Sequence, residues 1–383
     1  MFHKNVKIAL ATALVAGIVP LIVVGTANAD YAPQPSDVVA IGGDTPQYAA
    51  SFLADGDYNG DAGFNSTSPV NRLVTFNATA DANGRATYAK GSTTAQLNPT
   101  VVLRAGTKPV QRNSSSGNAI TALLADTTAP YMINFILSAS LPTVAQQTSA
   151  TAPFGGLHVI ELGTDSVQIA VNSTTNAPAG LSAQQLLYIY THPGVTWATV
   201  PGITGGSTDP VIALLPPTSS TIYKSFLSAL TTANGGVAPT LSGYTTVEQN
   251  DPTAITGATT PADAIVPFSS ARLNLFNDGY FQNPNNAFGT PQTTITAGIN
   301  LLSGTPGDFN PVLNVGITDY AIYRQNDQTS STIFEPGGTR NFAQTLFSNP
   351  GGSTPYFASN AGKALIAASG VTPVYADLGL AHA

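Results

Sequence analysis

The stretch DVVAIGGDTPQYAASFL, residues 37–53, contains a complete strand, turn and helix unit. Residues 37–43 form a short apolar run that is typical of a buried strand. Thr45 is then a suitable N-cap for a helix, and Pro46 is tolerated at a first helical position. The segments VQRNSSSGNAI (110–120) and ALLPPTSSTIY (213–223) repeat this order of strand end, hydroxyl-rich turn and helix start. The repeated order indicates an α/β protein.

Strand-like and helix-like segments alternate along most of the chain. Apolar runs predict strands at 157–163 and 166–172, and helical spacing predicts helices at 116–126, 182–191 and 219–230. Such alternation is typical of parallel strands that are joined by helices. The residues therefore predict an α/β fold with mixed, mostly parallel sheets.

The N-terminal residues 1–29 have the composition of a signal peptide. Lys4 and Lys7 precede an apolar run, and Ala27-Asn28-Ala29 matches a cleavage site with small residues at both ends. An uncleaved membrane anchor is the alternative, which Pro20 within the apolar run disfavours. No later stretch is long and apolar enough to span a bilayer. We therefore expect a secreted protein, either extracellular or associated with the cell wall.

Composition and motifs exclude several classes of function. The 383 residues include no cysteine and carry a net charge of −7, so we expect no disulfide, no thiolate chemistry and no nucleic-acid partner. The four histidines lack metal-ligand spacing, and no nucleophile elbow, Walker A motif or GxGxxG motif occurs. We therefore expect neither an enzyme nor a bound cofactor.

The three hydroxyl-rich helix starts share groups that can bind an anion. The first turn of a helix has unpaired backbone N–H groups and the positive end of the helix dipole, and neighbouring hydroxyls can donate further hydrogen bonds. Several such starts facing one cleft would form an oxyanion site without a metal. Ser and Thr are also ordinary N-caps, and most helices that they cap bind no ligand.

The segment SAQQLLYIYTHPGVTWATVPG, residues 182–202, resembles a segment of the phosphate-binding proteins of ABC importers, with an actinobacterial secreted subgroup as the nearest match. The resemblance implies a two-lobed periplasmic-binding-protein fold of type II, with phosphate or a similar oxyanion held between the lobes and an ABC permease as a partner. It implies that lobe 1 consists of residues 30–150 plus 265–383 and lobe 2 of residues 151–264. The ligand-binding residues that it implies are Thr45, Ser116, Gly117, Ser138, Ser219 and Thr221.

The chain departs from that family in the turn before the helix predicted at residues 219–230. The arginine that precedes the family's Ser-Gly-Thr is absent, because Pro216, Pro217 and Thr218 occupy this stretch, and Ser220 replaces the glycine. A charged arginine contact is among the stronger anion contacts, so its loss would leave a neutral site. The alternative function is therefore a structural or surface-interaction protein that keeps the scaffold without binding an anion.

The segment DGDYNGDAGFN, residues 55–65, begins like a calcium loop. Asp55, Asp57, Asn59 and Asp61 have suitable spacing, but the twelfth position, where such a loop needs a bidentate acid, is Ser66. The segment is therefore either a weak calcium site or a polar turn after a helix.

Overall fold

The computed structural model describes residues 31–383 except 69, 79–99, 114, 283–285, 287–288, 292, 303–315, 335–338 and 349–351. The predicted signal peptide at residues 1–29 lies outside the described residues. Within the described part of the chain, no helix has the length and hydropathy needed to cross a membrane.

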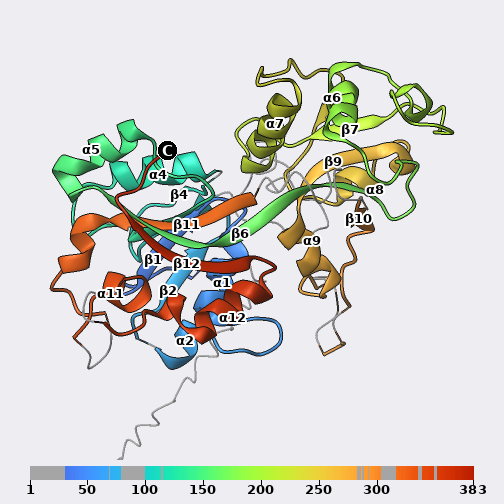
Figure 1. Ribbon diagram of the computed structural model, residues 1–383. Coiled ribbons are helices and arrows are strands. Elements are labelled where there is room, and N and C mark those ends of the chain that lie inside the picture. Colours follow the sequence, from blue (N-terminus) through green and yellow to red (C-terminus); the bar gives the residue numbers. More distant parts are fainter. Residues whose placement is uncertain are drawn as a thin grey trace, which may run out of the picture.

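One long strand connects two lobes (Figure 1). This strand, β6 (Leu157–Asn172), pairs through its first half with β11 (Gly316–Arg324) and β12 (Thr372–Gly379). Its second half pairs with β9 (Ala264–Ser269) and β10 (Ile299–Leu301). We name the part around the first half the proximal lobe and the part around the second half the distal lobe.

Parallel strands extend the sheet at both ends. In the proximal lobe, β1 (Val38–Gly42) lies between β2 (Leu73–Phe76) and β5 (Phe135–Ser138), and β5 pairs with β11. In the distal lobe, β7 (Ile212–Leu215) lies between β9 and β8 (Thr245–Thr246). The parallel pairs thus lie in the two wings and the antiparallel pairs lie at β6 and β11, while the short strands β3 (Thr100–Val101) and β4 (Val110–Gln111) form a separate ribbon. The predicted α/β class with a mixed sheet is confirmed.

The two strands predicted at 157–163 and 166–172 form one continuous strand. Thr164 and Asp165 interrupt the apolar pattern but do not end β6, because they pair with Thr318 and Ile317 of β11. Apolar periodicity reports burial, whereas strand continuity depends on a partner strand about 150 residues away. A local pattern could not show that partner.

Most helices begin at capping residues in the predicted segments. Ser115 caps α4 (Ser116–Ala125), Ser220 caps α7 (Thr221–Ala233), and Ser182 with Gln185 forms a capping box at α6 (Ala183–Thr191). Helix α1 (Gln47–Asp55) begins two residues after Thr45 and has no side-chain cap. The other α-helices in the described part of the chain are α2 (Phe64–Thr67), α5 (Val144–Phe154), α8 (Thr253–Thr256), α9 (Ser270–Asn277), α11 (Phe342–Leu346) and α12 (Asn360–Ala368).

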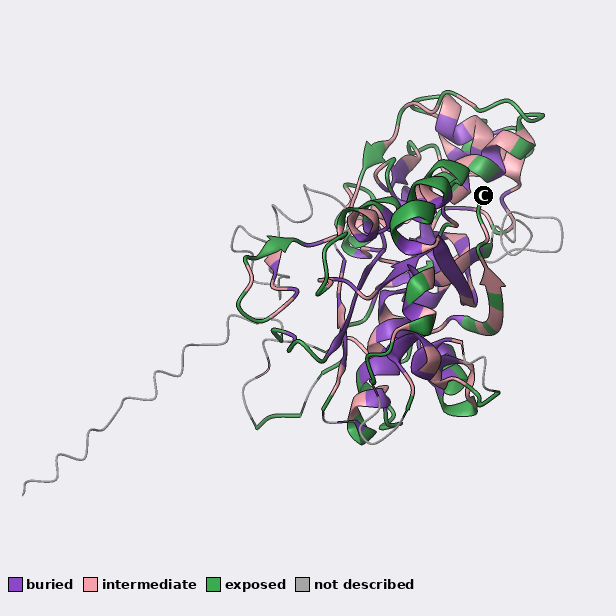
Figure 2. Cartoon of the chain, turned by 90° about the vertical axis from the view of Figure 1, so that its left-hand side faces the viewer, coloured by how far each residue is buried: buried purple, intermediate pink, exposed green. Residues whose placement is uncertain are grey.

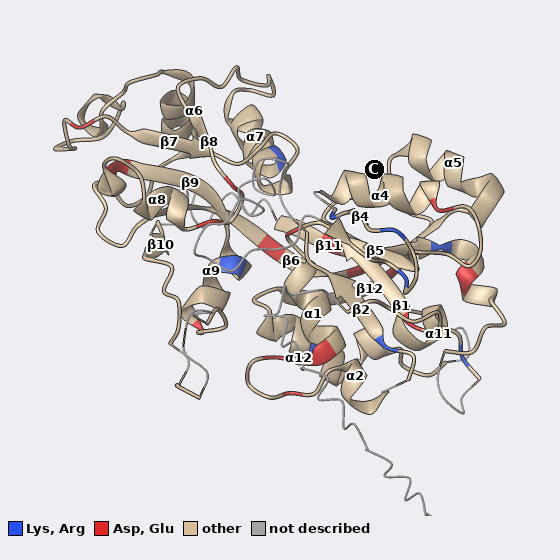
Figure 3. Ribbon diagram, turned by 180° about the vertical axis from the view of Figure 1, so that it is seen from behind, with Lys and Arg blue, Asp and Glu red and all other residues tan. Residues whose placement is uncertain are grey.

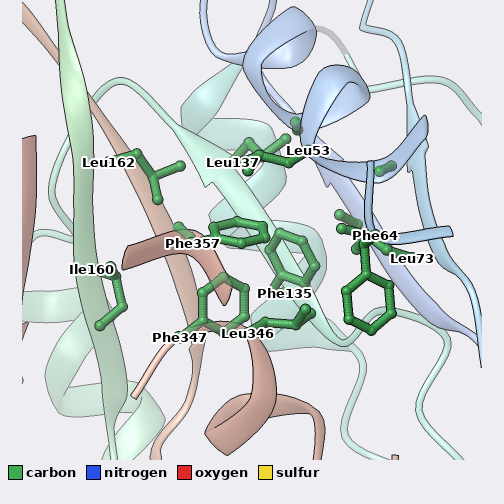
Figure 4. Packing of buried hydrophobic residues seen from close by; sticks show 14 of the residues in the cluster. Leu53, Phe64, Leu73, Phe135, Leu137, Ile160, Leu162, Leu346, Phe347 and Phe357 are labelled. Carbon is green, nitrogen blue, oxygen red and sulfur yellow. The ribbon is translucent and has the colours of Figure 1, made fainter. Parts of the chain in front are cut away.

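Aromatic side chains form the centre of one proximal core. Phe135 packs edge-on against Phe347 with ring centroids 4.9 Å apart, and Phe347 packs against Phe357 at 4.8 Å (Figure 4). A second proximal core, between α4, α5 and the opposite face of the sheet, includes Ile136 and Ile322. The central strands are accordingly buried, while the outer faces of the helices are exposed (Figure 2). The proximal sheet is therefore covered on both faces.

The strand pairing bears on the lobe boundaries. Strands β9 and β10 lie within residues 264–301 and pair with the distal half of β6. This pairing favours boundaries near Asp165 and Gly316. The division into 30–150 plus 265–383 and 151–264 stays a prediction.

Trp197 belongs to the core of the distal lobe. It is fully buried in a cluster with Tyr190 and Phe226, and its indole N–H donates a hydrogen bond to the Asp263 carboxylate at 3.0 Å. We expect its fluorescence to shift to longer wavelength in a urea titration, because unfolding exposes the ring to water. Phosphate should leave the emission of the folded protein unchanged, and a large response to phosphate would contradict this placement.

Candidate functional site

The starts of two helices from different lobes meet at Ala139. The Ala139 backbone N–H donates to the Ser116 hydroxyl at 2.8 Å, at the start of α4 in the proximal lobe. The Ala139 side chain packs against an apolar cluster that includes Ile222, in the first turn of α7 in the distal lobe. Val167 and Ile317 complete this apolar contact between the lobes. The starts of α4 and α7 therefore face one interlobe junction.

An open cavity of about 320 Å³ lies beside this junction. Ser140 and Tyr320 line it from the proximal lobe, and Ser225 of α7 lines it from the distal lobe. Backbone and hydroxyl groups border it together with apolar side chains, so a small polar solute could reach the two helix starts from this side.

The loop after β1 also reaches the junction. Gly43 lies so close to Ser116 that a Cβ on Gly43 would be 2.8 Å from the Ser116 hydroxyl oxygen. The Gly43 backbone N–H donates to the Leu137 carbonyl at 3.0 Å, which joins the turn after β1 to the end of β5. Thr45 follows two residues later and is buried. The turn after β1, the start of α4 and the end of β5 therefore form one packed group.

Two of the predicted ligand-binding hydroxyls have partners within the protein. Ser116 binds the Ala139 N–H, and Ser138 donates to the Ser140 carbonyl at 2.6 Å and accepts from the Ser140 N–H at 3.1 Å. Both side chains are buried. These contacts give Ser116 and Ser138 a role in fixing the loop at 138–140.

The other four predicted residues have unused polar groups. Within the described residues, no hydrogen bond involves the hydroxyls of Thr45, Ser219 or Thr221, and Gly117 is exposed in the first turn of α4. Ser220, which was not among the predicted ligand-binding residues, is the cap of α7, because its hydroxyl accepts the Tyr223 N–H at 2.9 Å. A serine directly before the helical segment was the sequence signal for this cap.

A buried ion pair joins the turn after β1 to α9, and the sequence analysis did not identify it. Arg272 of α9 contacts the Asp44 carboxylate at 3.0 Å, and both side chains are about nine-tenths buried. Burial opposes the charge of Arg272, but Asp44 more than offsets this effect, so the pKa of the guanidinium is raised. The polar position of Asp44 between a strand and a helix was the only available signal.

Two further acids are buried where β6 crosses between the lobes, and Figure 3 shows acidic residues on this strand. Asp165 accepts hydrogen bonds from the backbone N–H of Ala271 at 3.0 Å and from the hydroxyls of Ser269 and Ser270, at the start of α9. Burial raises the pKa of Asp165, although these bonds oppose the shift. Asp319 is fully buried, and neither carboxyl oxygen has a hydrogen-bond partner among the described residues. Burial, reinforced by the charge of Asp165, raises the pKa of Asp319 well above its usual value.

The candidate calcium segment is a closed turn. One oxygen of Asp57 accepts the backbone N–H groups of Asn59 and Asp61 at 3.0 and 2.9 Å, and the other accepts the Asn59 amide. Asp55 instead contacts Asn65 and Arg72. The described residues contain no group of three or more His, Asp or Glu side chains placed to hold a metal ion. This geometry favours the polar-turn interpretation.

No protein-family model and no curated protein sequence matches the chain. Among solved structures, a candidate phosphate ABC transporter substrate-binding protein with bound phosphate, from Clostridium perfringens, aligns at a TM-score of 0.51 and 11% identity, over 88% of this chain and 99% of that chain. The chain has a periplasmic-binding-protein fold. An ABC-type phosphate transport receptor from Vibrio cholerae aligns over the same shares, at a TM-score of 0.48 and 14% identity. The fold confirms the architecture that the resemblance implied, and the actinobacterial subgroup stays a prediction.

Proposed function

We propose that the protein is a secreted, non-enzymatic solute-binding protein that holds phosphate or a similar oxyanion between its lobes. The observation that carries this proposal is the contact of the α4 and α7 starts through Ala139. Unpaired N–H groups at both helix starts favour an anion, and the two helices belong to different lobes. An anion at this junction would therefore stabilise the contact between the lobes.

The donors available to the anion are neutral. They are the hydroxyls of Thr45, Ser219 and Thr221 and the first-turn backbone N–H groups of α4 and α7, including that of Gly117 but not those of Asn118 and Tyr223, which bond to the capping serines. Neutral hydrogen bonds contribute about 1 kcal/mol each, less than charged ones. We therefore expect weaker binding than in a site that contains an arginine. A secretory signal and an ABC permease partner are part of the same proposal.

A structural or surface-interaction role is the second candidate, and a specific observation favours it. Ser116, Ser138 and Ser220 already bind groups of the protein, and the fully buried Ile222 fills part of the junction. A scaffold that no longer binds an anion would have these contacts. The two candidates differ in whether purified protein binds phosphate.

Calorimetric titration with phosphate, and with sulfate for comparison, tests the first candidate. We expect Thr221→Val to weaken phosphate binding about fivefold, because one neutral hydrogen bond is lost from the site. The substitution preserves the side-chain volume, so the melting temperature should stay close to that of the parent protein.

Thr232→Val is the matched control, since Thr232 is exposed near the C-terminal end of the same helix. It should leave phosphate binding unchanged. If both substitutions weakened phosphate binding equally, a direct contact between Thr221 and phosphate would be contradicted. Absence of phosphate and sulfate binding in the parent protein would favour the structural role.

A further inference from the structure

The Asp44 carboxylate accepts hydrogen bonds from four side chains. One oxygen accepts from the Arg272 guanidinium at 3.0 Å and the Gln47 amide at 2.7 Å. The other accepts from the amides of Gln249 at 2.7 Å and Asn250 at 2.8 Å. We call these four donor residues the Asp44 cage. All four are buried, so the carboxylate has exchanged its hydration for fixed protein donors.

The cage joins the two lobes. Asp44 and Gln47 lie at the start of α1 in the proximal lobe, next to Gly43, which bonds to β5. Gln249 and Asn250 follow β8 in the distal lobe, and the Asn250 oxygen accepts the Ser269 backbone N–H at the end of β9. Asp44 therefore makes a polar contact between lobes that differs from the apolar contact at Ile222.

The donors are arranged for an anion. A guanidinium and three amide groups converge on two oxygens, which is the contact pattern that proteins present to a bound carboxylate or phosphate. Arg272 is held in place by the Tyr48 ring, with 4.4 Å between the guanidinium carbon and the ring centroid. Within the described residues, the buried Gln249 side-chain oxygen has no hydrogen-bond partner, whereas its amide nitrogen donates to Asp44. The bond to the Asp44 carboxylate therefore accounts for the orientation of this amide.

We propose that Gln47, Gln249, Asn250 and Arg272 form an oxyanion-binding site that the Asp44 carboxylate itself occupies, so that the chain uses an internal anion to hold its lobes together. The site takes a small carboxylate, the chemical class of the Asp44 side chain. It is separate from the helix starts of α4 and α7 and does not depend on phosphate binding there.

The test is chemical rescue with formate. Asp44→Ala removes the internal carboxylate and leaves a space beside the four donors. We expect this variant to have a lower melting temperature and a larger radius of gyration in X-ray scattering than the parent protein. Formate, compared with sodium chloride at equal ionic strength, should reverse both changes and bind about tenfold more tightly to the variant than to the parent.

Asp55→Ala is the matched control, because Asp55 lies at the other end of α1 and pairs with Arg72 in an exposed ion pair. Formate should not affect this variant. Adding Arg272→Met to Asp44→Ala should abolish the rescue, since the charged donor is then lost. Failure of formate to stabilise Asp44→Ala, or equal stabilisation of Asp55→Ala, would overturn the proposal.

The isosteric Asp44→Asn variant provides a second measurement in a chain that retains its packing. It removes the negative charge, so the radius of gyration should again increase, and an unchanged value would overturn the role of Asp44 in joining the lobes. Formate rescue of Asp44→Ala is measured in the absence of phosphate. Its failure is therefore distinguishable from failure of the proposed phosphate binding, which the Thr221 variant tests.

Discussion

Replacing Arg324 by alanine is expected to lower the free energy of unfolding by about 3–5 kcal/mol, the cost of breaking a buried ion pair from one side. Arg324, at the end of β11, is 1% exposed and contacts the Asp126 carboxylate at 3.0 Å. Its guanidinium also donates to the backbone carbonyls of Ile133 at 2.7 Å and Asp126 at 2.8 Å. Alanine would leave all these acceptors buried without their donor.

Two aromatic rings add to this effect. The Arg324 guanidinium carbon lies 3.9 Å from the Tyr131 ring centroid and 4.9 Å from that of Phe154. Cation–π contacts are strongest when the cation is desolvated, as it is here. The truncation therefore also removes packing between α4, α5 and the sheet.

Urea denaturation followed by circular dichroism measures the change, with Arg72→Ala as the matched control. Arg72 and Asp55 form an ion pair at 3.5 Å, with side chains 40% and 66% exposed. An exposed pair contributes about 0–1 kcal/mol, so the control should unfold close to the parent protein. Similar losses in the two variants would contradict a special role for the buried pair.

Local patterns predicted those parts of the fold that depend on neighbouring residues. The helix at 182–191 was recognisable because Ser182 and Gln185 form a capping box within four residues. The turn after Asp55 was recognisable for the same reason, since Asp57 binds backbone groups two and four residues later. These interactions lie within the window that a sequence pattern covers.

Long-range pairing accounts for what the sequence did not show. Arg324 and Asp126 are 198 residues apart, and Arg272 and Asp44 are 228 residues apart. The continuity of β6 depends on β11 in the same way. Each partner is an ordinary polar residue in its own segment, so only the folded chain shows the pair.

The candidate site shows the same difference between local patterns and long-range contacts. The hydroxyl-rich helix starts were predictable from composition, and the structure brings the starts of α4 and α7 to one junction. Which hydroxyls remain unused was not predictable. Ser116 is engaged because Ala139, 23 residues away, presents its N–H at the right place.

Replacing Asp319 by asparagine is expected to raise the free energy of unfolding at neutral pH, because ionisation of this acid favours the unfolded parent chain by about 1.4 kcal/mol for each unit by which the folded pKa is raised. Asp319, on β11, is fully buried, and within the described residues neither oxygen accepts a hydrogen bond. Burial and the nearby Asp165 carboxylate raise the pKa of Asp319 well above its usual value. Asparagine has nearly the same shape and carries no charge.

The expected dependence of the free energy of unfolding on pH follows from the raised pKa of Asp319. An acid whose pKa is higher in the folded than in the unfolded protein does not reduce stability while it is protonated in both states. As pH rises above the unfolded value of about 3.9, the unfolded chain releases its proton first, and the folded state loses relative stability up to the folded pKa. Asp319→Asn removes this loss, so the variant and the parent should differ little at low pH and diverge as pH rises.

Thermal unfolding from about pH 4, close to the unfolded pKa, to mildly alkaline pH measures this divergence, with Asp209→Asn, at an exposed position, as the control. The control should follow the parent protein at every pH. A pH profile of Asp319→Asn parallel to that of the parent would mean that Asp319 ionises alike in the folded and unfolded chain. Such a result would contradict the burial of Asp319 on β11, where that strand pairs with β6.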